Sequence, residues 1–337
     1  MPVALPIGIF RLLKTQNCLS GIIKLANFAV MSGLNPHHEA TLREVVAELS
    51  AGENLVNICP SQWRGEPLPS QQAVKEIITL SRAIIFPGFF GDSDVTRENL
   101  LYFTGLWSEK LYKLLVDQIH AGLSMDICTE DAPEFAATER IAASKAAAFM
   151  ARLPELRRLL NADVRATYYG DPAATSIQEV IYCYPGIRAI CNYRIAHELV
   201  LLDVPIIPRM ISEVAHGETG VDIHPAATIG ESFTIDHGTG IVIGATAIVG
   251  DNVKIYQGVT LGAKSFDLDK DGNPVKGEPR HPIIGNNVII YSNASILGRI
   301  TIGDNAVIGG NIWVTENVAA GERLIQAKAN NVLRIKH

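Results

Sequence analysis

An aliphatic residue recurs at every sixth position through most of residues 221–320. The repeat positions are Ile223, Ile229, Ile235, Ile243, Val249, Ile255, Leu261, Ile284, Ile290, Ile296, Ile302, Ile308 and Val314. The pattern slips by two residues past Ile241, and a polar segment interrupts it between Leu261 and Ile284. Because helices repeat every 3.6 residues and strands every two, neither explains a period of six. The pattern is typical of a parallel β-helix built from hexapeptide repeats.

Each six-residue unit is expected to form one short strand and one bend, so that three units close a triangular coil. The aliphatic side chain then points inward and stacks on its equivalents in the neighbouring coils. One coil cannot bury its own inner face, so stability must come from stacking and from covered ends. Small residues and asparagine at the bends are expected to adopt positive φ. These bend residues are Gly230, Gly250, Asn252, Gly285, Asn286, Gly303 and Asn305.

Composition limits the class of protein and its surroundings. The 337 residues carry a net charge of −6 and no cluster of lysine and arginine, which argues against a nucleic-acid partner. The five cysteines are dispersed without a CxxC pair, as suits free thiols in a reducing compartment. No apolar run is long enough for a transmembrane helix, and the first residues do not match a signal peptide. We therefore expect a cytoplasmic protein with no membrane contact.

The chain is expected to be α+β, with an all-α N-terminal part followed by the coil. Residues 1–210 are predicted to form a helical assembly domain, with helices at 39–49, 71–86, 100–115 and 189–202. A further helix at 136–160 is expected to be interrupted near Pro154, and Asp171 is expected to cap the helix that follows it. The β-helix domain is predicted at 211–321, with an excursion loop at 263–282, and a short tail follows at 322–337.

Three polar clusters depart from the apolar pattern of the coil. They are Asp222-Ile-His224, Asp236-His237 and Arg280-His281. Asp222 and His237 are 15 residues apart, so a coil of about 18 residues places them on neighbouring coils. A carboxylate beside an imidazole holds its tautomer and raises its basicity, as a general base requires. Residue spacing leaves a second interpretation open, in which both are corner residues bonded to the backbone.

The excursion loop is a candidate binding element, because loops on a rigid scaffold often carry functional residues. Arg280 and His281 stand at its return, and the planar guanidinium of Arg280 suits a substrate carboxylate. The segment from Asp267 to Glu278 also satisfies a calcium-loop pattern. That motif needs flanking helices, whereas here both flanks are hexapeptide strands. A turn at Asp-Gly-Asn-Pro explains the segment without a metal, and no metal site is predicted.

Taken in order, four motifs closely resemble those of bacterial serine O-acetyltransferases. They are Asp222-Ile-His-Pro, Asp236-His237-x-Thr-Gly-Ile, Gly258-Val-Thr-Leu-Gly262 and Arg280-His281-Pro. The likeness extends upstream to Gly170-Asp171-Pro-Ala-Ala and Tyr193-Arg-Ile-Ala-His197, and covers residues 165–315. The resemblance implies a left-handed β-helix after a helical N-terminal domain, of the branch with a longer N-terminus.

The family reaction forms O-acetylserine from L-serine and acetyl-CoA, the step that commits carbon to cysteine. The resemblance implies that His237 is the general base and that Asp222 orients it, with direct attack and no acyl-enzyme. It also implies substrate binding by Asp171, Asp236, Arg280 and His281. Acetyl-CoA, the co-substrate, would contact Gly262, Ala263 and Ser292 between neighbouring subunits. A homotrimer or a dimer of trimers, and feedback inhibition by L-cysteine, follow from the same likeness.

Two features depart from the family pattern. Tyr291-Ser-Asn293 replaces a Gly-Ala-Gly at the CoA-side coil, and Ile325-Gln-Ala-Lys-Ala replaces Ala-Gly-x-Pro-Ala after the last coil. The longer C-terminal tail ending in isoleucine is not seen, which argues against a complex with O-acetylserine sulfhydrylase.

Three other functions fit the repeat. A hexapeptide acyltransferase for a sugar or another hydroxyl or amine acceptor would have no obvious use for Asp171, Arg280 and His281 together. A γ-type carbonic anhydrase needs a His-x4-His pair, and His216, His224, His237 and His281 do not provide it. In a non-catalytic assembly protein, the Asp222 and His237 pair would be incidental.

Overall fold

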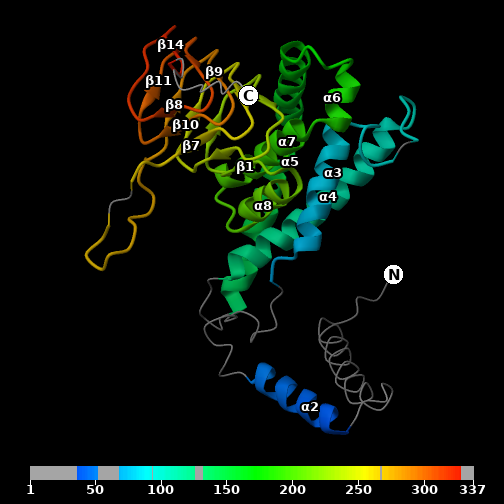
Figure 1. Cartoon of the computed structure of the whole chain (residues 1–337). Coiled ribbons are helices and arrows are strands. Elements are labelled where there is room, and N and C mark those ends of the chain that lie inside the picture. Colours follow the sequence, from blue (N-terminus) through cyan, green and yellow to red (C-terminus); the bar gives the residue numbers. More distant parts are fainter. Residues whose placement is uncertain (1–35, 52–67, 93, 126–131, 266–267, 328–337) are drawn as a thin grey trace. The chain divides into compact units, whose positions relative to one another are not determined.

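A computed structural model describes residues 36–51, 68–92, 94–125, 132–265 and 268–327 (Figure 1). The chain divides into two compact units, residues 1–63 and 64–337. Helix α2 (Pro36–Ser50) belongs to the first unit and confirms the helix predicted at 39–49. Its apolar side chains Leu42, Val45, Val46 and Leu49 are exposed. The coil and the helices packed against it belong to the second unit.

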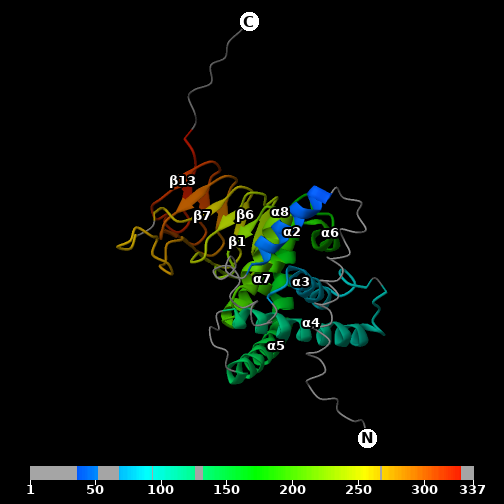
Figure 2. The same ribbon diagram turned by 90° about the horizontal axis from the view of Figure 1, so that it is seen from below.

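The described helices of the second unit are α3 (Gln71–Ile85), α4 (Leu100–Ser124), α5 (Ala132–Gly170), α6 (Ile177–Cys183), α7 (Pro185–Leu201) and α8 (Ile207–Thr219). Figures 1 and 2 show α7 and α8 beside the first strands of the coil, with α3 and α4 farther from it. One continuous apolar core runs from Val74 in α3 to Val318 in the last coil.

Several helix predictions need correction. The helix predicted at 100–115 continues to Ser124, and Pro154 lies inside α5 without ending it. A proline removes one backbone hydrogen bond, but Leu153, Leu156 and Leu160 around it are buried and hold the helix together.

The caps of the later helices also differ from the prediction. Ser176, not Asp171, caps α6, with its Oγ accepting a hydrogen bond from the Glu179 amide at 3.1 Å. Pro208 lies in the first turn of α8, where a proline loses no helical hydrogen bond.

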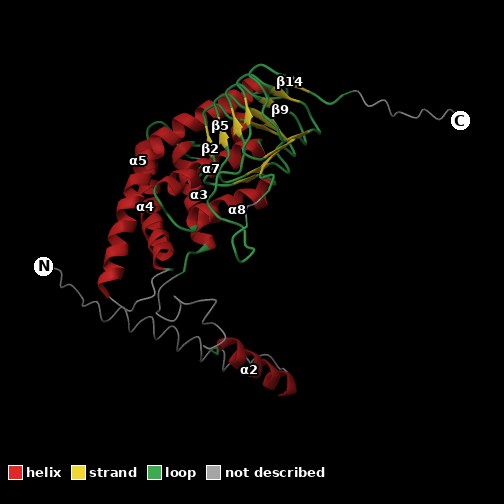
Figure 3. Cartoon of the chain, turned by 90° about the vertical axis from the view of Figure 1, so that its left-hand side faces the viewer, coloured by secondary structure: helices red, strands yellow, loops and turns green. Residues whose placement is uncertain are grey.

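The repeat forms a parallel β-solenoid of three sheets, as predicted (Figure 3). The first sheet has the order β1-β4-β7-β10-β13, the second β11-β8-β5-β2 and the third β14-β12-β9-β6-β3. The strands are β1 (Asp222–Ile223), β2 (Thr228–Ile229), β3 (Thr234–Asp236), β4 (Val242–Ile243), β5 (Ile248–Val249), β6 (Lys254–Tyr256), β7 (Thr260–Gly262), β8 (Ile283–Ile284), β9 (Ile289–Ile290), β10 (Ser295–Leu297), β11 (Thr301–Ile302), β12 (Val307–Ile308), β13 (Trp313–Val314) and β14 (Arg323–Leu324). The repeat aliphatics stack in register, as Ile223 on Ile243 and Ile243 on Leu261.

The corner residues divide into two groups, which partly corrects the prediction of positive φ. Asparagines do adopt it, at 55° for Asn252 and 60° for Asn305, although Asn287 rather than Asn286 takes this role. The corner glycines Gly230, Gly250, Gly285 and Gly303 do not have positive φ. Each of them instead allows close approach between neighbouring coils. A Cβ on Gly230 would lie 2.7 Å from the carbonyl carbon of Gly250, and one on Gly303 would lie 2.5 Å from the Ala320 nitrogen.

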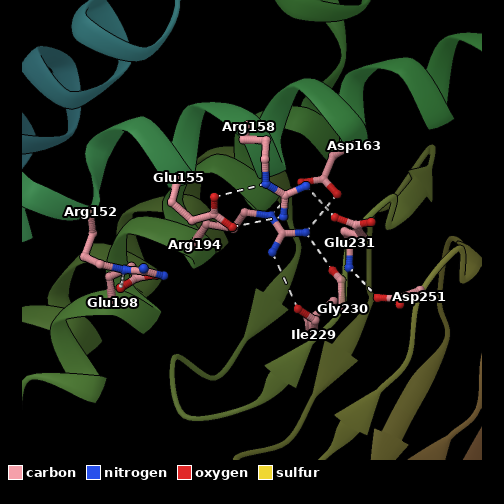
Figure 4. Close-up of polar contacts among 10 residues, drawn as sticks. All are labelled: Arg152, Glu155, Arg158, Asp163, Arg194, Glu198, Ile229, Gly230, Glu231 and Asp251. Carbon is pink, nitrogen blue, oxygen red and sulfur yellow. Dashed lines mark hydrogen bonds and ion pairs between the residues drawn. The ribbon is translucent and has the colours of Figure 1, made fainter.

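The Tyr193-Arg-Ile-Ala-His197 motif joins α7 to the first coil. The Tyr193 hydroxyl donates to the Ala227 carbonyl at 2.7 Å, and His197 Nδ1 contacts the Pro225 carbonyl at 2.8 Å. Between them, the buried Arg194 binds Asp163 of α5 at 2.6 and 2.8 Å and the Gly230 carbonyl at 2.8 Å (Figure 4). Asp163 also accepts the Phe233 amide at 2.9 Å. One ion pair therefore fixes two helices to the solenoid.

The predicted loop between Leu261 and Ile284 is present, and its described part contains a tight turn. Asp269 Oδ1 accepts the amides of Asp271 and Asn273, both at 2.9 Å, and Leu268 pairs with Pro274. This confirms the turn predicted at Asp-Gly-Asn-Pro, while Asp267 lies outside the described residues. Among the described helices, none combines the length and apolar character of a membrane span. The domain boundaries after 210 and 321 and the left hand of the coil stay predictions.

Candidate active site

The first polar group of the solenoid gathers where α5 ends beside the third sheet. We call it the α5-side cluster; its members are Asp171, Tyr184, Asp236, His237 and Lys254. The Tyr184 hydroxyl donates to Asp171 Oδ2 at 2.7 Å, and the Ala173 amide donates to Oδ1 at 2.8 Å. These two bonds lower the pKa of Asp171, and the bond to Asp171 raises the pKa of Tyr184 to about 12. Asp171 is therefore a fixed, ionised carboxylate suited to an ammonium group.

His237 stands on the corner between the third and first sheets, directly after β3. Its backbone has φ of 58°, a left-handed conformation that histidine tolerates better than most residues. The corner turns the ring away from the coil, and the side chain is 75% exposed. His237 Nε2 lies 3.8 Å from Asp236 Oδ1. The imidazole is therefore open to a substrate, as a general base must be.

Lys254 is a member of this cluster that the sequence did not point to. Its Nζ lies 3.0 Å from Asp236 Oδ2 and donates to the Gly170 carbonyl at 2.8 Å. Lys254 occupies an outward position of β6, where the hexapeptide pattern accepts a polar residue and so gives no sign of a function. Only the strand register indicates that Lys254 could reach Asp236, since β6 pairs with β3 and so lies beside Asp236.

The second polar group, the loop-side cluster, lies on the corner between the first and second sheets, where the excursion loop returns. Its members are Asp222, His224, Arg280, His281 and Arg299. His281 is 7% exposed, and its ring fills the space above Gly244, where a Cβ would lie 2.0 Å from Cδ2. Burial, with Arg280 nearby, lowers the pKa of His281 to about 4. Its Nδ1 accepts the Thr246 amide at 3.1 Å, so neutral His281 carries its proton on Nε2.

The backbone of the loop return is held from the coil. Thr246 Oγ1 accepts the Arg280 amide at 2.9 Å, and Arg299 donates to the carbonyls of Thr246 and His281 at 2.6 and 2.9 Å. Arg299 was not singled out in the sequence, although it follows His281 by 18 residues, the length of one coil. This support gives the Arg280 main chain a defined position on the solenoid.

Asp222 is paired with the helical part rather than with His237. Its carboxylate lies 4.0 Å from Arg209 of α8, which also binds Glu213. No hydrogen bond or ion pair joins Asp222 to His237 within the described part of the chain, so their predicted pairing stays a prediction. Glu213, His216 and Asp222 place potential metal-ligand atoms within 4.8 Å of one another. Arg209 already supplies a positive charge to both carboxylates, so we interpret the group as an ion-pair cluster.

The three residues predicted to contact CoA divide between the same two corners. Gly262 ends β7 and Ala263 follows it on the loop-side corner, whereas Ser292 follows β9 on the corner that carries His237. The Gly262 carbonyl accepts the Gly298 amide at 3.0 Å, and the Ser292 carbonyl accepts the Asn311 amide at 2.9 Å. Within one chain, the residues predicted to bind serine and those predicted to contact CoA are therefore both divided between the two corners.

A cavity of about 450 Å³ lies between α3 and α8, and its lining includes Arg209, which contacts Asp222 of the loop-side cluster. It is lined by Val74, Ile206, Met210 and Val214, with Lys75 and Glu218 at its polar side. None of the predicted substrate residues lines it, so we assign the site to the two clusters instead.

Sequence relatives and solved structures agree on one family. Residues 281–311 match the model described as bacterial transferase hexapeptide (six repeats). A plasmid-encoded serine acetyltransferase of Synechococcus elongatus is 48% identical over 264 residues, covering 78% of this chain and 83% of that protein. The chain belongs to the serine acetyltransferase family.

Similarity to other serine acetyltransferases supports this assignment. That of Mycobacterium tuberculosis is 45% identical over 159 residues, covering 47% of this chain and 66% of that protein. The crystal structure of Entamoeba histolytica serine acetyltransferase 1 in complex with L-cysteine is similar with a TM-score of 0.64. It is 34% identical, covering 77% of this chain and 87% of that one. The isoform 3 structure, also in complex with cysteine, has a TM-score of 0.63 and 33% identity, covering 77% of this chain and 84% of that one.

Proposed function

We propose that this protein is a serine O-acetyltransferase, moving the acetyl group of acetyl-CoA to the hydroxyl of L-serine. One observation carries the proposal beyond family membership. The α5-side cluster offers two carboxylates to an ammonium group, while the loop-side cluster offers Arg280 and the Nε2–H of His281 to a carboxylate. An amino acid carries both of these charges, whereas a neutral sugar carries neither.

In the proposed reaction, His237 removes the proton from the serine hydroxyl as its oxygen attacks the thioester carbonyl. The carbon–sulfur bond then breaks, the thiolate of CoA leaves and takes up the proton from His237, and O-acetylserine forms without an acyl-enzyme. Asp222 would orient the imidazole and stabilise its protonated form. Asp171 and Asp236 would hold the ammonium, and Arg280 with His281 would hold the carboxylate.

We further propose that each site is shared between two copies of the chain in a trimer, or in a dimer of trimers. No hydrogen bond or ion pair joins Asp222 to His237 among the described residues, and the predicted serine and CoA residues are divided between two corners. A three-sided coil carries both corners at its edges, so cyclic assembly would bring one corner to the other corner of a neighbour. Gly262 and Ala263 of one copy and Ser292 of the next would then line the CoA path.

The predicted feedback inhibitor follows from the same chemistry. L-Cysteine has the ammonium and carboxylate of serine, so it would compete for the site as a feedback inhibitor. The Entamoeba histolytica enzymes hold cysteine in their crystal structures. A cytoplasmic location stays a prediction, as do the expected absences of nucleic-acid, membrane and O-acetylserine sulfhydrylase partners.

The decisive experiment measures thiol release from acetyl-CoA with serine, homoserine or an amino sugar as the acceptor. We expect serine to react fastest, and no reaction with serine would reject the proposal. His237→Ala should lower kcat by about 10² to 10⁴, the usual contribution of a general base. An unchanged kcat in that variant would remove His237 from this role, and a preference for the amino sugar would favour the alternative acceptor class.

A further inference from the structure

Lys254 joins the parts that the proposed serine site needs to keep together. Its Nζ contacts Asp236 Oδ2 at 3.0 Å and the Gly170 carbonyl at 2.8 Å. Gly170 is the last residue of α5 and directly precedes Asp171. The side chain is only 16% exposed, and its ammonium lies 4.7 Å from the centre of the Tyr256 ring. One ammonium group therefore ties the end of α5 to the third sheet.

This contact sets the orientation of the Asp236 carboxylate. Lys254 holds Oδ2, and this leaves Oδ1 on the side of His237, 3.8 Å from Nε2. Rotation of the carboxylate would break a charge-assisted hydrogen bond in a half-buried setting, where such bonds are strong. Tyr256 supports the same geometry, because its ring is stacked on Tyr291 at 5.2 Å and is held in place under the ammonium.

The charges around the cluster explain why a cation is needed there. Asp171 approaches from the end of α5, Tyr184 from the start of α7, Asp236 from β3, and Lys254 with Tyr256 from β6. Lys254 and His237 both help to lower the pKa of Asp171, after the larger effects of Tyr184 and the Ala173 amide. Two carboxylates directed at one ammonium would repel each other, and Lys254 offsets this repulsion before substrate arrives.

We propose that Lys254 is a positioning residue that fixes the ammonium-binding carboxylates. The inference rests on the proposed serine acetylation and adds a residue to it. Without Lys254, the Asp236 carboxylate would turn freely. Serine would then bind more weakly.

The test compares Lys254→Met and Lys254→Arg with the wild-type protein. Lys254→Met should raise the KM for serine about 10-fold, the effect of one charge-assisted hydrogen bond on binding. The KM for acetyl-CoA should stay within about 2-fold, since the CoA path does not include this residue. Lys254→Arg keeps the positive charge and should restore much of the wild-type KM for serine. Lys113→Met, which removes an exposed lysine paired with Glu109 on α4, is the matched control.

A second readout does not depend on turnover. Serine binding is measured by isothermal titration calorimetry in the absence of acetyl-CoA. The Kd for serine should rise about 10-fold in Lys254→Met and stay unchanged in Lys113→Met. An unchanged Kd together with an unchanged KM for serine would overturn the inference. A raised Kd in a protein that binds serine but does not acetylate it would keep Lys254 as a positioning residue and reject the proposed function alone.

Discussion

At the scale of single residues, the site depends on side chains held in unusual surroundings. His281 fits above Gly244 only because that residue lacks a Cβ, and Thr246 fixes its tautomer. His237 takes a left-handed backbone conformation, so its ring leaves the coil at a corner. Backbone conformations of this kind often mark functional positions. Neither property follows from residue type, since both arise from the stacking of neighbouring coils.

The buried imidazole of His281 predicts how stability responds to pH. Its pKa is about 4 in the folded protein, against an ordinary value of 6.5, so the unfolded chain takes up the proton first. The stabilising effect of the neutral ring is therefore complete above pH 6.5 and is lost as pH falls toward 4. Urea unfolding at pH 7 and pH 5 should show a smaller loss of stability for His281→Gln than for the wild type. Equal losses would show that His281 titrates normally.

At the scale of secondary-structure elements, the attachment of the helices to the first coil positions Asp171. Helix α5 carries the buried Asp163 near its C-terminal end and Gly170 as its last residue, so the ion pair with Arg194 also places the residue that follows the helix. Lys254 makes the second attachment at the end of α5 itself. The length of α5, unbroken at Pro154, lets one helix connect the helical core to the site.

We expect a large loss of stability when the ion pair between Arg194 and Asp163 is broken. Arg194→Met would leave the Asp163 carboxylate buried without its partner, which costs about 3–5 kcal/mol for such pairs. The double variant with Asp163→Asn should recover part of that loss, because the remaining amide carries no charge. Unfolding in urea measures both, and Lys113→Met serves as an exposed-pair control with little expected change. A single variant as stable as wild type would show that the pair does not hold the helices.

At the scale of the whole molecule, the proposed shared site predicts complementation between inactive variants. His237→Ala and Arg280→Ala should each be nearly inactive alone. Mixed during refolding, they would form some interfaces with an intact His237 from one copy and an intact Arg280 from the next. Random mixing should restore about a quarter of wild-type activity, because one interface in four combines both intact corners. No recovery in a mixed assembly, verified with differently tagged copies, would place the whole site in one chain.

The solenoid could be predicted from residue order alone, because neither a helix nor an ordinary sheet repeats its aliphatic residues every six positions. Residue order also indicated the loop at 263–282 and the polar residues at the interruptions. It did not show that Pro154 is accommodated within α5, that Gly230 and Gly303 serve close approach rather than positive φ, or that Lys254 binds Asp236.

These features depend on contacts between distant segments, and a periodic pattern records only which face of a strand each residue occupies. The three-dimensional arrangement was needed to show that Asp222 and His237, 15 residues apart, take different partners within one chain. The interruptions between Ile235 and Ile284 mark the proposed site, and the packing of α5, α7 and α8 against the coil determines which residues lie beside it.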